Sequence, residues 1–115
     1  LGYLVQMDDL SKQRGDRAAH LLLALAHPAR IRLVQLLAQS GEGTLTMLAP
    51  LVRLDMPSVS RHLRQLVGQG LLEPRRQGKQ IYYRLANDVA TDVLRLLLSS
   101  RLVEPHTPPA TRAQP

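Results

Sequence analysis

The side chains that could recognise a ligand gather in one stretch of the 115-residue chain. The 32 residues from 53 to 84 hold seven basic residues against two acidic ones, and they carry five of the chain's six net positive charges. The basic residues are Arg53, Arg61, Arg64, Arg75, Arg76, Lys79 and Arg84. Clustered arginine is typical of a surface that binds duplex DNA, because guanidinium groups pair with phosphates and with guanine. A solvated face that binds nothing would show the same charge.

The composition argues against several other kinds of site. The chain has no cysteine, which excludes disulfides, thiolate nucleophiles and cysteine-ligated metal centres. It has three tyrosines and no phenylalanine or tryptophan, which disfavours stacking of single-stranded bases on aromatic side chains. Because no glycine-rich phosphate loop, paired-carboxylate cluster or Ser/His/Asp arrangement is present, the sequence predicts a protein that is not an enzyme.

Hydrophobic spacing predicts a mainly α-helical domain with a two-stranded β-wing. Apolar residues recur at helical spacing over 8–26, 28–39, 56–67 and 88–100. A shorter helix is expected from Thr46, as its cap, to Leu54, with Pro50 distorting it. Period-two alternation over 71–77 and 80–85 predicts a hairpin that reverses at Gly78. The order α-α-α-α-β-β-α is that of a winged helix-turn-helix domain.

This domain is predicted to cover residues 8–103. Residues 1–7 are expected to be a flexible segment, with Met7 nearer the natural start than Leu1. Residues 104–115 are expected to be a disordered tail, since four of the last eleven residues are proline. The longest apolar run, over 21–26, has six residues and is too short to span a bilayer. A cytoplasmic protein that does not contact a membrane is therefore expected.

The predicted helix over 56–67 has one apolar stripe and an opposite polar face. The major groove of DNA admits one α-helix, so this polar face is predicted to read it. The candidates are Ser58, Ser60, Arg61, His62, Arg64 and Gln65. The arginines and the glutamine are long enough to reach base edges, whereas the serines near the helix start suit phosphates or bases. His62 flanks the apolar stripe and is expected either to contact a phosphate or to pack.

The turn of the predicted hairpin supplies a second set of candidates. These residues are Arg75, Arg76, Lys79 and Gln80. A wing that carries them would reach phosphates or the adjacent minor groove. The helix would then read bases while the wing positions the protein on the DNA backbone.

Three segments carry a resemblance to a known family. Residues 25–33 read LAHPARIRL, residues 57–66 read PSVSRHLRQL, and residues 70–72 are followed by RRQGKQIYYRL over 75–85. In this order they resemble the second helix, recognition helix and wing of the ArsR/SmtB family of bacterial winged-helix repressors, over residues 20–98. The resemblance implies a homodimer whose first and last helices pack across a twofold axis, on DNA half-sites roughly 34–36 Å apart.

The candidate residues of the dimer interface are the apolar side chains of the first and last predicted helices. They are Leu21, Leu22, Leu25, Val93, Leu94, Leu97 and Leu98. The same leucine-rich face over 89–98 would also suit the core of a single chain. We expect it to serve both purposes.

The resemblance also raises the question of an effector, because many members of the family release DNA when a metal binds. One recurring ligand set uses cysteines on the third helix, and residues 44–48 have none. The other uses the start and end of the last helix. Asp88 and Asp92 are present there, but residues 93–100 hold no His, Glu or Asp. Both sets are therefore incomplete.

Other forms of control stay open. His20, His27 and His106 could join Asp8, Asp9 or Glu104 across the dimer in an unusual nickel or zinc site, although ordinary helix, cap and tail roles explain these histidines more simply. No cofactor is required for the predicted function. A small molecule, a protein partner or no effector at all is equally compatible with the sequence. The alternative function is a winged-helix interaction module that acts through a partner regulator, and the intact polar face over 58–65 argues against it.

Overall fold

The computed structural model describes residues 8–105, and its elements follow the predicted order. They are α1 (Asp9–Leu25), α2 (Pro28–Ser40), α3 (Leu45–Val52), α4 (Met56–Gly68), β1 (Leu72–Gln77), β2 (Gln80–Leu85), α5 (Val89–Leu98) and a 3-10 helix (Arg101–Val103). The predicted flexible segment 1–7 and residues 106–115 of the predicted tail lie outside the described residues. The mainly α-helical fold with a two-stranded wing is as predicted.

A core of leucine, valine and alanine holds α2, α3 and α4 together. Leu33 and Val34 of α2 are fully buried against Leu63 and Leu66 of α4. Full burial of such a side chain stabilises the fold by roughly 1.5–3 kcal/mol relative to exposure. This core sets the position of α4 without any phenylalanine or tryptophan.

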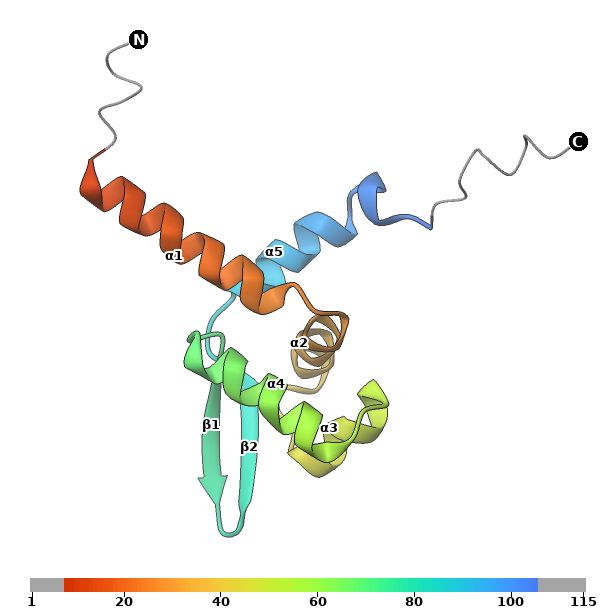
Figure 1. The fold of residues 1–115 in the computed structure, drawn as a ribbon. Helices are drawn as coiled ribbons and strands as arrows, with labels where there is room; N and C mark the ends of the chain where they lie inside the picture. Colours follow the sequence, from red (N-terminus) through yellow and green to blue (C-terminus); the bar gives the residue numbers. More distant parts are fainter. Residues whose placement is uncertain (1–7, 106–115) are drawn as a thin grey trace, which may run out of the picture.

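The α1 and α5 helices lie on one side of this core, and the wing extends from the other (Figure 1). Arg17 of α1 reaches the end of α4, where its guanidinium donates to the Gln69 backbone carbonyl at 2.7 Å. The α1 helix is therefore hydrogen-bonded directly to the residue that follows α4.

The third helix begins differently from the prediction. Its cap is Thr44, whose hydroxyl oxygen accepts from the Met47 backbone N–H at 3.2 Å, and not Thr46, which is exposed. The helix ends at Val52 because Arg53 adopts a left-handed conformation with φ of 59°. The predicted limits of 46–54 were thus wrong by one or two residues at each end, while Pro50 is accommodated inside the helix.

The hairpin is antiparallel and reverses at Gly78, as predicted, with a φ of 63° that suits glycine. Its register gives the wing two distinct faces. Leu72, Pro74 and Arg76 pair with Leu85, Tyr83 and Ile81 on one face. Glu73, Arg75 and Gln77 pair with Arg84, Tyr82 and Gln80 on the other.

A residue from outside the hairpin joins its sheet. Gly43 forms an antiparallel bridge to Tyr83, with backbone N–H to carbonyl distances of 2.9 and 3.0 Å in the two directions. This bridge makes β2 a central strand and leaves β1 at the edge. Pro74, which has no N–H to donate, accordingly lies on the edge strand.

Among residues 8–105, no single helix is long and apolar enough to cross a bilayer. The α1 and α2 helices reach that length and hydropathy only when taken together, across a bend of 89°.

Candidate nucleic-acid interface

The polar face of α4 is exposed and its apolar face is locked into the core. Val59 and Leu63 are fully buried, whereas Arg61, Arg64 and Gln65 are exposed. The three long polar side chains predicted to reach base edges therefore lie on the free side of one rigid helix. They belong to a helix of 13 residues, long enough to enter a groove of DNA.

The start of α4 is fixed by a side-chain cap. The Asp55 carboxylate accepts the Ser58 backbone N–H at 3.0 Å and the Ser58 hydroxyl at 2.7 Å. These two hydrogen bonds lower the pKa of Asp55 below its ordinary value, the hydroxyl contributing most. The Ser58 hydroxyl is thus already engaged in the cap, and Arg61 approaches it with a guanidinium nitrogen at 3.4 Å.

Ser60 is brought together with the tip of the wing. It is half-buried and lines a hollow with Lys79 and Gln80 of the hairpin and with Thr46 at the start of α3. The starts of α3 and α4 and the tip of the hairpin therefore meet at this hollow.

The wing arginines differ in what surrounds them. The Arg75 guanidinium donates to both carboxylate oxygens of Glu42, at 2.7 and 3.3 Å, and lies 4.7 Å from the centre of the Tyr82 ring. The hydrogen bond to Glu42 raises the pKa of Arg75. Arg76 and Lys79 are exposed, and within residues 8–105 no hydrogen bond or ion pair engages either side chain. The charge of Arg75 is therefore compensated, whereas that of its neighbours is available.

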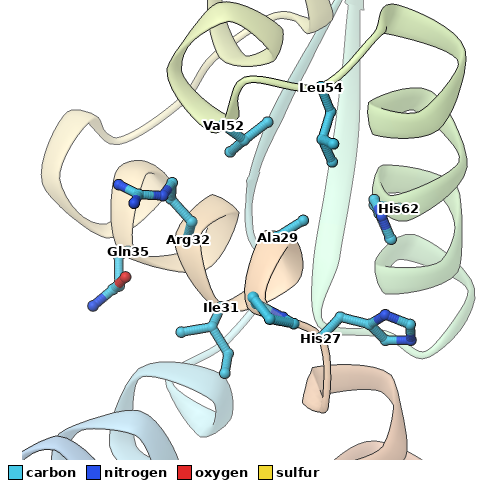
Figure 2. Close-up of a pocket in the computed structure, with 9 residues that line it drawn as sticks. His27, Ala29, Ile31, Arg32, Gln35, Val52, Leu54 and His62 are labelled. Atoms are coloured by element: carbon cyan, nitrogen blue, oxygen red, sulfur yellow. The ribbon is translucent and has the colours of Figure 1, made fainter. Parts of the chain in front are cut away.

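His62 faces α2 and not the free side of α4. Its Nδ1 atom accepts a hydrogen bond from Arg30 Nε at 3.0 Å, and its ring lies 5.4 Å from that of His27. Figure 2 shows His62 and His27 lining the same hollow, below Val52 and Leu54. Of the two roles expected for His62, packing is the one observed.

Burial and positive neighbours alter the titration of this histidine. Burial contributes most to lowering the pKa of His62, followed by the charges of Arg30, His27 and Arg61. Arg30 also donates to the Ala24 carbonyl of α1 at 3.0 Å, so it connects α1 and α4 through its own helix. Beyond the presence of an arginine at the start of α2, no sequence pattern indicated this link.

Within one chain, the described residues do not bring His20 or His27 together with a group of carboxylates. His20 is exposed on α1, His27 faces His62, and His106 lies outside the described residues. Within residues 8–105 no three His, Asp or Glu side chains form a group that could hold a metal ion. Asp92, at the start of α5, pairs instead with Arg95 at 2.9 Å. The residues present do not fit either metal site that the resemblance implied.

The candidate dimer residues divide into core and surface. Leu25 and Leu94 are each only 5% exposed within one chain, so they belong to its own core, and Leu21 and Val93 pack against that core. Leu22, Leu97 and Leu98 are about half exposed. Further exposed apolar side chains on the same two helices and the segment after them were not among the candidates. These are Leu10, Leu23, Val89, Leu96, Leu102 and Val103.

The known proteins to which this chain is similar are named as repressors or transcriptional regulators. The chain is 40% identical over 86 residues to the biofilm growth-associated repressor of Agrobacterium fabrum, spanning 75% of this chain and 73% of that one. It is 34% identical over 91 residues to a transcriptional repressor SmtB homolog of Synechocystis, spanning 79% and 68%. Among solved structures, it resembles a homodimeric winged helix-turn-helix DNA-binding domain from Mycobacterium bovis, described as a possible ArsR-family regulator. That match has a TM-score of 0.72 and 28% identity, covering 89% and 95% of the two chains.

A family model described as a helix-turn-helix domain matches residues 25–75, which run from the end of α1 into β1. The fold, the exposed polar face of α4 and the wing define a winged helix-turn-helix transcriptional regulator, which is not an enzyme. The chain belongs to the ArsR/SmtB family.

Proposed function

We propose that this chain binds operator DNA as a homodimer and represses transcription from the site it occupies, in the cytoplasm. The observation that carries the proposal is the polar face of α4. Arg61, Arg64 and Gln65 are exposed there, while the other face of the helix is fully buried. Relatives of similar length are named as repressors, which supports repression of transcription over activation.

The recognition helix α4 is proposed to lie in the major groove. Arg61 and Arg64 suit guanine, to which arginine donates two hydrogen bonds, and Gln65 suits adenine. Such contacts discriminate between bases by roughly 1–3 kcal/mol each. The capped and buried helix is pre-organised for this contact, because its core-facing side chains cannot turn outward without exposing leucine.

The wing is proposed to supply contacts with phosphates. Arg76 and Lys79 are exposed and carry charge that no described acidic side chain compensates. Contacts of this kind strengthen binding to any sequence and make it depend on salt. Arg75 contributes less in this proposal, because Glu42 holds its guanidinium.

The dimer is proposed to form through the exposed apolar surfaces of α1 and α5. Leu22 of α1 and Leu97 and Leu98 of α5 would lie at the seam, on the side of the core opposite the wing (Figure 1). Burying exposed leucine removes apolar surface from water, at about 25 cal/mol per Å². The similar domain from Mycobacterium bovis is homodimeric, which supports the formation of a dimer.

We propose that DNA binding needs no metal cofactor. An effector, if the protein has one, would be of another kind and would act by changing the affinity for DNA.

The first test is fluorescence anisotropy of the purified protein on the DNA upstream of its own gene, with a random duplex of equal length as control. We expect clear preference for the upstream DNA and a steep salt dependence. Equal, weak binding to both duplexes at every salt concentration would instead favour an interaction module that acts through a partner.

A further inference from the structure

A groove runs between the second half of α4 and the wing. Its volume is about 430 Å³, within the range of roughly 300–1,000 Å³ usual for small-molecule sites. One wall contains Arg64, Val67 and Gly68, and the other contains Arg76, Ile81 and Tyr83. The wall on the wing is the face that the strand register turns toward α4.

The groove is positively charged and has no counter-ion of its own. Arg64 and Arg76 are exposed, and within residues 8–105 no acidic side chain forms an ion pair with either. The nearby carboxylates of Glu42 and Glu73 are taken by arginines on the opposite face of the wing, at 2.7 and 2.6 Å. An anion that enters the groove therefore meets two guanidinium groups without competition.

The rest of the groove's lining is mainly apolar. Val67, Ile81 and Tyr83 are half-buried, and Val67 and Tyr83 pack against the core. A DNA phosphate would satisfy the arginines but would leave these hydrocarbon and aromatic surfaces uncovered. A ligand that combines a carboxylate with an apolar body would use both features, since guanidinium pairs with carboxylate through two parallel hydrogen bonds.

We propose that this groove binds a small hydrophobic carboxylate and that the bound carboxylate releases DNA. The release follows because the ligand occupies Arg64 and Arg76, which the proposed function assigns to bases and phosphates. The inference thus rests on the proposed function for its regulatory consequence. Binding of the ligand to the DNA-free protein can be measured independently of it.

The first experiment titrates 4-phenylbutyrate into the ¹⁵N-labelled full chain without DNA and follows the backbone amide signals. We expect saturable shifts at Val67, Gly68 and Ile81. The neutral amide of the same acid should bind at least about tenfold more weakly, because it cannot form the charge-assisted hydrogen bonds. Absence of saturation, equal binding of the amide, or shifts confined to other parts of the molecule would overturn the proposal.

Gly68 provides a matched pair of variants. A β-carbon at Gly68 would meet no atom within 4 Å, and the backbone there is helical, so alanine fits the fold. Gly68→Leu should fill the groove and weaken binding of 4-phenylbutyrate by about tenfold or more, whereas Gly68→Ala should leave it nearly unchanged. If Gly68→Leu does not fold, Arg76→Gln tests the same site, with Arg84→Gln on the opposite face as its control. Equal affinity in both members of either pair would contradict the assignment.

The second experiment measures DNA binding with and without the carboxylate. At a concentration ten times its own Kd, 4-phenylbutyrate should raise the apparent Kd for the operator about tenfold, as competition requires. If the operator binds normally and the carboxylate leaves its affinity unchanged, the proposed release is wrong. If the operator fails to bind in the absence of carboxylate, the proposed function fails, while the titration of the DNA-free chain still decides whether the groove is a carboxylate site.

Discussion

Both faces of the wing carry arginine, two on one face and one on the other, and they differ in what those arginines can do. On the face turned away from α4, Arg75 pairs with Glu42 and Arg84 with Glu73. On the face turned toward α4, no described carboxylate pairs with Arg76. Net charge over a stretch of sequence therefore overstates the charge available to DNA. The strand register, which places alternate residues on opposite faces, decides which arginines remain free.

The largest expected effect on DNA binding comes from removing a free arginine that is proposed to contact a base. Arg64→Ala should weaken binding to the operator by roughly 1–3 kcal/mol and relax the preference at one position of the sequence. Arg84→Ala, which removes an arginine paired on the far face, is the matched control and should cost much less. Anisotropy titrations on the operator and on a random duplex measure both effects. Equal losses in the two variants would show that pairing does not separate the faces.

A smaller effect is expected from the wing cations that are proposed to contact phosphates. Lys79→Ala or Arg76→Ala should weaken operator and random DNA to a similar extent and reduce the slope of log Kd against log salt by about one. Arg75→Ala should change that slope less, since its charge is already compensated by Glu42. A change in the preferred sequence on replacing Lys79 would contradict the division of roles between helix and wing.

Freeing a paired arginine should strengthen binding to DNA. Glu42→Gln removes one negative charge and releases Arg75, so binding to any duplex should strengthen by a few-fold and the salt slope should increase by up to about one. Glu104→Gln removes the same charge from an exposed position beyond α5 and serves as the control. If both variants strengthen binding equally, the effect is one of net charge alone.

The smallest expected effect is on the free energy of unfolding. It concerns the side of α4 that faces α2, where His62 accepts a hydrogen bond from Arg30. Because burial and nearby cations lower the pKa of His62, the folded protein binds a proton there less readily than the unfolded chain. The free energy of unfolding should therefore be highest above pH 7 and fall as the pH drops below roughly 6.5, the ordinary pKa of histidine. Denaturant titrations at pH 7 and pH 5 measure this loss.

The matched variant for that measurement is His62→Gln, which keeps an acceptor for Arg30 but does not titrate. Its loss of stability between pH 7 and pH 5 should be smaller than that of the parent chain. Identical losses would assign the pH dependence to groups other than His62.

The sequence predicted what depends on local pattern. Helical spacing and Gly78 at a reversal are set by residues within a few positions of one another, and both were predicted. The cap of α3 was misplaced by two residues, because both Thr44 and Thr46 suit a helix start and only packing selects between them. Thr44 is the buried one, at 4% exposure.

The features that sequence reasoning missed depend on contacts between distant segments. Glu42 lies 33 residues from Arg75, and they meet because Gly43 joins the sheet beside β2. The periodicity of α1 and α5 marked their apolar faces but could not say which leucines the chain itself covers. Leu25 and Leu94 are covered, whereas Leu22 and Leu97 are not.

The central claim is that a dimer reads a specific sequence through α4, and selection of bound duplexes from a random pool tests it most directly. The account predicts enrichment of a palindrome whose half-site centres lie about 10–10.5 base pairs, or a multiple of that spacing, apart. Arg64→Ala should lose the preference at one position of each half-site. Enrichment of no sequence, or of a single half-site without symmetry, would contradict the account.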